Sequence, residues 1–104
     1  MITLYGIKTC DTCRKAAKAL DVTLTDIRAT PLTSADLERF YAAFGASLVN
    51  TRSTTWRGLS QDDRARAPLD LLTAYPTLMK RPVIEADGTL HLGWGKDVQA
   101  LFAG

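Results

Sequence analysis

The sequence lacks the features that mark several large classes of proteins. It contains no long run of apolar residues, which excludes the usual signature of a membrane-spanning helix. Neither sign of charge predominates, since 13 basic residues accompany 11 acidic ones and the basic residues are scattered, which does not favour direct binding of nucleic acid. A strand-like segment begins at residue 2, where a signal peptide would have a charged and then an apolar region. We therefore expect a cytoplasmic protein.

Side chains that bind metals are also scarce. The sequence has two cysteines and one histidine, His91, whereas a structural zinc site takes about four protein ligands. We therefore expect no metal. His91 lies between Leu90 and Leu92 on a short predicted strand, so it should point away from the face that these leucines bury, into solvent.

The order of the expected elements predicts the fold class. The 104 residues, of which 46% are hydrophobic, suffice for one globular domain and are too few for two, so we expect a single domain over 1–104. Strands are predicted at 2–5, 22–27, 82–85 and 89–92, helices at 14–20 and about 96–102, and a helical region at about 29–77. This order predicts an α/β, thioredoxin-like fold with a mixed four-stranded sheet. The helical insertion separates its β-α-β and β-β-α halves.

Local signals refine the helical region and the last hairpin. Thr33 is a plausible N-cap because Asp36 follows three residues later, and Ser60 begins a second helix in the same way. Gly45 is a stop signal for the first of these helices, and Asp87-Gly88 predicts a tight hairpin turn. We expect one apolar helical face to pack in the core, formed by Leu37, Phe40, Tyr41 and Phe44.

The segment Cys10-Asp11-Thr12-Cys13 is the strongest functional signal, because it lies where the first strand gives way to the first helix. The N-terminus of a helix stabilises a thiolate, and the neighbouring charges of Lys8, Arg14 and Lys15 should lower the pKa of Cys10 further. We interpret Cys10 as an exposed attacking thiolate, in preference to a buried and inert cysteine.

Cys13 allows two interpretations. It could resolve a mixed disulfide formed by Cys10, or it could be the small residue that packs the helix against the sheet. We favour the resolving or switch role.

Two further segments could contribute to a site. A proline that opens the third strand of such a fold can be cis and face the cysteine loop, which would bring Arg81 of Arg81-Pro82 near Cys10. An ordinary strand-start proline beside a surface arginine is an equal alternative. The polar stretch Asn50–Arg57 could form an anion-binding lip, but its composition favours a solvated loop.

Together, three segments resemble the ArsC-like family, which contains glutaredoxin-coupled arsenate reductases, Spx regulators and YffB-type proteins. They are Tyr5–Ala16, Leu48–Arg57 and Leu78–Ile84, and they most resemble the YffB-type branch. The resemblance implies that Cys10 is the catalytic cysteine and that Cys13 matches the second cysteine of the Spx and YffB branches. It also implies that Arg81 lies next to the active-site thiol and that Pro82 is the family's cis proline. The predicted substrate-binding residues are Thr9, Thr12, Arg14, Arg52, Pro82 and Trp94.

The departures from the family pattern bear on the reaction. Asn50 occupies a position where the arsenate reductases have an arginine, and Leu92–Gly95 replaces a second arginine. Fewer charged donors weaken an oxyanion site. We therefore expect a thiol–disulfide reductase that uses Cys10 and glutathione, with glutaredoxin as a further partner and no bound cofactor. The alternatives are an arsenate reductase coupled to glutathione or glutaredoxin, and an Spx-like redox switch that binds RNA polymerase.

Overall fold

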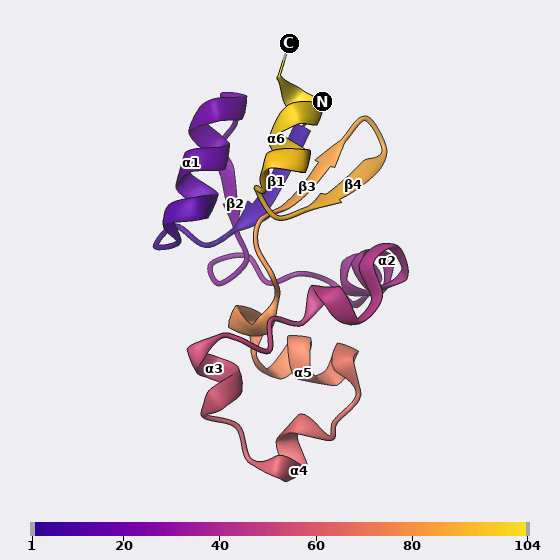
Figure 1. Ribbon diagram of the computed structural model, residues 1–104. Helices are drawn as coiled ribbons and strands as arrows, with labels where there is room; N and C mark the ends of the chain where they lie inside the picture. The colour runs from indigo at the N-terminus through magenta and orange to yellow at the C-terminus, as the bar shows by residue number, and fades with distance from the viewer. Residues whose placement is uncertain (1, 104) are drawn as a thin grey trace. The chain divides into compact units, whose positions relative to one another are not determined.

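A mixed four-stranded sheet organises the two ends of the chain in the computed structural model, which describes residues 2–103 (Figure 1). The strands are β1 (Ile2–Gly6), β2 (Leu24–Asp26), β3 (Val83–Ala86) and β4 (Thr89–Leu92), in the order β2-β1-β3-β4. β1 pairs with β2 in parallel and with β3 antiparallel, and β3 and β4 form a hairpin. The predicted α/β class and mixed sheet are confirmed.

The predicted hairpin turn is confirmed at Asp87 and Gly88. Their φ angles are 50° and 86°, so both residues have left-handed backbone, as a type I′ turn requires. The second strand is shorter than the predicted 22–27. Val22 donates its N–H to the carbonyl of Ala17 at the end of the first helix, so this backbone group is used before the strand begins.

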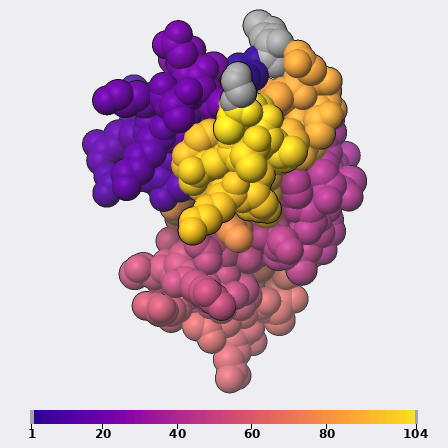
Figure 2. All heavy atoms as spheres, turned by 45° about the horizontal axis from the view of Figure 1, so that its top comes forward, coloured from indigo at the N-terminus to yellow at the C-terminus, as the bar shows by residue number. Residues whose placement is uncertain are grey.

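Two helices cover the same face of the sheet. α1 (Asp11–Leu20) and α6 (Lys96–Phe102) contribute Ala16 and Val98 to a core that also contains Leu4 and Ile84. Figure 2 shows α6, in yellow, at the surface between α1 and the β3–β4 hairpin. The helices thereby shield the central strands β1 and β3, from which the candidate site is built.

His91 corrects one prediction. It is paired with Ile84 across β3 and β4, and it points away from its leucine neighbours as expected. That face carries α6, however, and the ring of Phe102 meets the His91 ring edge-on at 5.3 Å between centroids. His91 is therefore half-buried against a helix, and its interpretation as a solvated strand residue is wrong.

Tertiary contacts divide the chain into two compact units, one of residues 1–30 with 81–104 and the other of residues 31–80. The single domain stays a prediction. The helices of the second unit, in its described residues, accord with the expected helical region, and one isolated antiparallel β-bridge pairs Val49 with Met79. The helices are α2 (Ser34–Phe44), η1 (Gly45–Leu48), α3 (Thr54–Arg57), α4 (Gln61–Arg64), α5 (Pro68–Ala74) and η2 (Pro76–Leu78).

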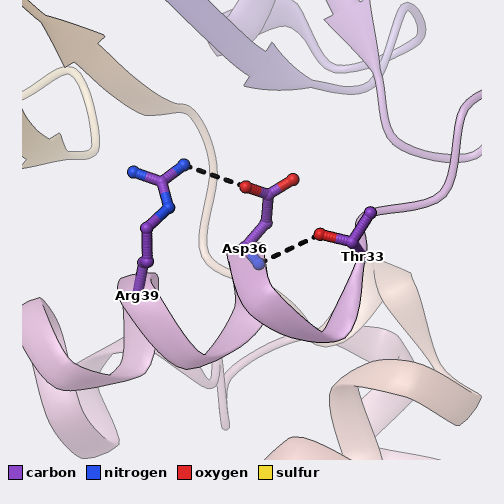
Figure 3. A network of polar contacts seen from close by, with 3 residues as sticks. All are labelled: Thr33, Asp36 and Arg39. Carbon is purple, nitrogen blue, oxygen red and sulfur yellow. Dashed lines mark hydrogen bonds and ion pairs between the residues drawn. The ribbon is translucent and has the colours of Figure 1, made fainter.

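The predicted start of α2 is confirmed. Thr33 accepts a hydrogen bond from the backbone N–H of Asp36 at 3.1 Å, and the Asp36 carboxylate accepts one from Arg39 at 2.9 Å (Figure 3). An acidic residue in the first turn also complements the helix dipole. Of the predicted apolar face, Leu37 and Phe40 are buried, whereas Tyr41 and Phe44 are half-buried.

The segment 50–57 is only partly a loop, which corrects another expectation. Ser53 accepts a hydrogen bond from the backbone N–H of Trp56 and so caps the short helix α3. Arg64 from α4 donates to the carbonyl of Trp56 and lies over its indole ring, at 5.4 Å from the centroid. Side-chain partners from a neighbouring element therefore order residues that composition alone assigns to solvent.

Candidate active site

Cys10 lies at the N-terminus of α1, as the sequence predicts. The chain leaves β1 through a turn in which the Cys10 N–H donates to the carbonyl of Ile7 at 3.0 Å. Cys10 is the N-cap residue, with extended backbone, and its carbonyl accepts the N–H of Arg14. This arrangement directs the free N–H groups of the first helical turn toward the half-buried Cys10 thiol.

The surroundings of Cys10 favour a thiolate. Burial raises the pKa of Cys10, but three interactions outweigh it: the backbone N–H of Cys13, the Cys13 thiol and the guanidinium of Arg81. The net effect is a pKa below the ordinary value of a cysteine. The sequence assigned this lowering partly to Lys8, Arg14 and Lys15, yet Arg14 forms an ion pair with Asp11. The cation that acts on Cys10 is Arg81.

Strand pairing explains how Arg81 reaches Cys10. β3 runs antiparallel to β1 with Val83 opposite Tyr5, so residues just before β3 lie at the edge where the chain leaves β1. The Arg81–Pro82 peptide bond is cis, as predicted. Pro82 is fully buried, and its carbonyl accepts the N–H of Gly93 at 2.7 Å. The residues alone left the position of Arg81 open and the family resemblance implied it; the strand pairing gives its physical cause.

Cys13 is fully buried one helical turn after Cys10, where α1 packs against β1. The contact is so close that a Cβ atom on Gly6 would lie 2.5 Å from the Cys13 sulfur. Burial, together with the neighbouring Cys10, raises the pKa of Cys13 to about 11. Cys13 therefore holds its proton at neutral pH and can donate a hydrogen bond to the Cys10 thiolate.

Comparison with known proteins identifies the family. The model of the ArsC family matches residues 5–101 of the chain. The chain belongs to the ArsC family. Over 99% of its length it is 44% identical to the whole of an uncharacterized protein of Haemophilus influenzae. It is 30% identical to the global transcriptional regulator Spx 1 of Lactococcus lactis, over 93% of this chain and 84% of the regulator.

Solved structures agree with this membership. A YFFB protein has a TM-score of 0.85 and 32% identity to the chain, and 97% of each chain is covered. An arsenate reductase (ArsC) related protein from Brucella melitensis has a TM-score of 0.74 and 35% identity, with 97% of this chain and 93% of that one covered. The predicted resemblance to the ArsC-like family and its YffB-type branch is confirmed.

The other predicted site residues of this ArsC-family chain fall into three places. Thr9, Thr12 and Arg14 are exposed around the N-terminus of α1, and their role in binding a substrate stays a prediction. Trp94 packs against the core of the first unit and stacks on Phe102, with 6.2 Å between ring centroids. That contact gives Trp94 a packing role, and its part in binding likewise stays a prediction.

Arg52 belongs to the second unit, where it lines an open groove of about 510 Å³. Backbone hydrogen bonds hold the two sides of this groove together: the Asn50 N–H donates to the carbonyl of Leu78, and the Lys80 N–H to that of Leu48. The described lining residues include two cations and no carboxylate, and they are Ser47, Val49, Asn50, Thr51, Arg52 and Lys80.

Gly6 and Asp26 were not among the residues predicted to build the site. Gly6 is part of the Tyr5–Ala16 segment, and the lack of a side chain beside a cysteine motif could have suggested a close approach. Asp26 ends a strand, a position at which aspartate often accepts hydrogen bonds from the following turn.

Two features are absent from the described part of the chain. Among residues 2–103, no group of three or more histidine, cysteine, aspartate or glutamate side chains could hold a metal ion. Within the same residues, no helix has the length and apolar character needed to cross a membrane.

Proposed function

We propose that this ArsC-family protein is a glutathione-dependent thiol–disulfide reductase in which Cys10 is the nucleophile. The observation that carries the proposal is the environment of the Cys10 thiol, which meets the N-terminus of α1, the Cys13 thiol and the Arg81 guanidinium. The thiolate is the form of cysteine that attacks disulfides, and a lowered pKa increases its fraction at neutral pH.

The reaction proceeds in two exchanges. The Cys10 thiolate attacks the glutathione sulfur of a mixed disulfide, which forms a Cys10–glutathione disulfide and releases the substrate as a thiolate that takes up a proton. A second glutathione, as its thiolate, then attacks the glutathione sulfur of that intermediate, which gives oxidised glutathione and restores the Cys10 thiolate. Over the two exchanges the substrate sulfur is reduced to a thiol and the sulfur of the incoming glutathione is oxidised to the disulfide level, while the glutathione sulfur already present in the mixed disulfide keeps its oxidation state. Arg81 stabilises the negative charge on the Cys10 sulfur both when the thiolate attacks and when it is the leaving group.

We assign the second exchange to glutathione rather than to Cys13. The Cys13 sulfur is fully buried and its pKa is raised to about 11, so very little of it is thiolate at neutral pH. Attack by Cys13 would need the α1 N-terminus to open first. The sequence favoured a resolving role for Cys13, whereas its burial supports a role as hydrogen-bond donor to Cys10.

Arg52 is the predicted binding residue that suits glutathione as co-substrate. Glutathione has two carboxylates, and a guanidinium can hold a carboxylate through charge-assisted hydrogen bonds. We assign Arg52 to binding one of these carboxylates. An Arg52→Ala variant should raise the KM for glutathione and leave the Cys10 alkylation rate unchanged, because the thiol keeps its own partners.

The test is turnover of a small glutathione mixed disulfide, coupled to glutathione reductase and the oxidation of NADPH. Cys10→Ser should abolish turnover, because a hydroxyl does not replace the thiolate. Cys13→Ser should retain a substantial fraction of it, because glutathione performs the second exchange. Wild-type turnover no higher than that of Cys10→Ser would refute the reductase proposal, and loss of activity in folded Cys13→Ser would assign the second exchange to Cys13.

A redox-switch regulator is the second candidate, favoured by 30% identity to a protein named as the global transcriptional regulator Spx 1. Under this alternative the chain binds RNA polymerase in a manner that depends on the oxidation state of Cys10 and Cys13. A pull-down of RNA polymerase by the oxidised and reduced protein separates the two functions. Arsenate added as a substrate in the turnover assay tests the arsenate-reductase alternative in the same experiment.

A further inference from the structure

The carboxylate of Asp26 joins two turns at the edge of the sheet. Asp26 is the last residue of β2 and lies opposite Gly6 of β1 in the parallel ladder. One carboxylate oxygen accepts the backbone N–H of Lys8 at 3.0 Å. The other accepts the N–H of Arg28 at 2.8 Å and that of Ala29 at 3.3 Å. A single side chain thus satisfies three backbone donors.

Lys8 lies inside the turn that delivers Cys10 to the helix. Within this turn the Cys10 N–H donates to the carbonyl of Ile7, and the backbone N–H of Ile7 donates to the Cys13 sulfur. The bond to Asp26 adds an anchor from β2. Three strands therefore help to position the Cys10 thiol. β1 leads into the turn that contains Cys10, and β2 anchors this turn through Asp26. β3 begins just after Arg81, which contacts the thiol.

The ionised form of Asp26 is the one that makes these contacts. The N–H groups of Lys8 and Arg28 lower the pKa of the Asp26 carboxyl below its usual range, so the group is a carboxylate at neutral pH. A carboxylate that accepts several backbone N–H groups is a strong, directional anchor.

We propose that Asp26 is a positioning residue for the Cys10 thiol, because its carboxylate holds the Ile7–Cys10 turn where Cys10 meets Arg81 and the first turn of α1. Asp26 acts through the turn and does not touch the reacting sulfur. The inference rests on the proposed role of Cys10 as nucleophile, and it adds a residue that supports that role from the neighbouring strand.

The direction in which the pKa of Cys10 shifts after substitution of Asp26 distinguishes a positioning role from a purely electrostatic effect of the carboxylate charge. Removal of a nearby negative charge would by itself stabilise a thiolate and lower the pKa of Cys10. Loss of a positioning contact does the opposite, because a loosened turn weakens the hydrogen bonds from Cys13 and Arg81 to the thiolate. Asp26→Asn removes the charge and leaves only one oxygen to accept hydrogen bonds, in a side chain of nearly the same shape.

The experiment measures the rate at which iodoacetamide alkylates Cys10 across a range of pH, with the modified residue identified by mass spectrometry. We expect Asp26→Asn to raise the pKa of Cys10 by about half a unit to one unit, so alkylation at neutral pH slows about threefold to tenfold. The plateau rate at high pH should stay the same. Amide hydrogen exchange at Lys8 should become faster in the variant.

Asp21→Asn is the matched control, because Asp21 is an exposed carboxylate at the other end of α1 and asparagine tolerates its positive φ of 55°. It should leave the Cys10 profile unchanged. An unchanged or lowered pKa of Cys10 in folded Asp26→Asn would overturn the inference. Failure of the reductase proposal is separate: the wild type would then show no turnover of glutathione disulfides while the Asp26→Asn shift in the alkylation profile persisted.

Discussion

Cys10 and Cys13 are one helical turn apart, yet their surroundings move their pKa values in opposite directions. Cys10 is half-buried and meets Arg81 and a backbone N–H, which lower its pKa. Cys13 has no exposed surface, and burial raises its pKa to about 11. Cys10 therefore supplies the thiolate, and Cys13 supplies a protonated thiol that can donate a hydrogen bond to it. These roles suit a site in which Cys10 alone is the nucleophile.

The raised pKa of Cys13 predicts a loss of stability in alkali. The folded protein keeps this proton longer than the unfolded chain, whose cysteines titrate near pH 8.5, so the stabilisation is complete below that pH and is lost as the pH rises toward 11. In a Cys10→Ser background, we expect unfolding in urea under reducing conditions to show a loss of about 2 kcal/mol between about pH 8 and about pH 10.5 that is attributable to Cys13. Cys10→Ser/Cys13→Ala should lack this part of the loss; equal slopes for the two proteins would contradict the prediction.

At the scale of elements, the close packing of α1 on β1 depends on Gly6. The Cys13 sulfur occupies the space in which any other residue at position 6 would place its Cβ atom. The same helix begins at Cys10, so the distance between α1 and β1 also positions the thiol at the edge of the sheet. Gly6 has no reactive side chain, and it supports the site because it allows α1 to pack closely against β1.

Gly6→Ala should destabilise the fold by about 1–3 kcal/mol, as is typical when an extra methyl group is forced into a packed core. Chemical denaturation measures the change. In a Cys13→Ala background the cost should be smaller, because the sulfur that meets the new methyl group is gone. Gly58→Ala is the matched control, since the nearest atom to its new Cβ would be the Thr55 carbonyl oxygen at 3.6 Å. Equal effects at the two glycines would refute this account of Gly6.

At the scale of the molecule, tertiary contacts divide the chain into two compact units, and the chain passes from the first unit to the second and back to the first. The chain builds β1, α1 and β2, passes through residues 31–80, and returns to complete the sheet and α6. Each unit buries its own apolar residues, such as Leu4 and Ile84 in the first and Phe40 and Leu48 in the second. Units built in this way can open locally with different free energies.

Phe40→Leu tests whether the units open separately. The smaller side chain should cost about 1 kcal/mol and speed amide hydrogen exchange about fivefold in residues 31–80, with little change in the sheet. Ile84→Val is the complementary variant, for which the sheet amides should respond instead. A uniform acceleration throughout the chain in both variants would indicate a single cooperative unit, as the sequence-based prediction of one domain implies.

Sequence by itself determined the features that depend on residues close together in the chain. The cap at Thr33, the turn at Asp87-Gly88 and the helix start at Cys10 follow from hydrogen bonds and backbone angles within a few residues. The class of the fold follows from the order of such segments. The ArsC-like resemblance was likewise visible in three short segments.

Only the tertiary structure decided which distant groups meet. Antiparallel pairing of β1 with β3 brings Arg81 to Cys10, and parallel pairing of β1 with β2 brings Asp26 to Lys8. The cations next to Cys10 in the sequence are poor guides to its surroundings, since Arg14 forms an ion pair with Asp11 while Arg81 lowers the pKa of Cys10. The physical reason is that strand register and helix packing depend on contacts throughout the core, so they cannot be inferred from the composition of a short segment.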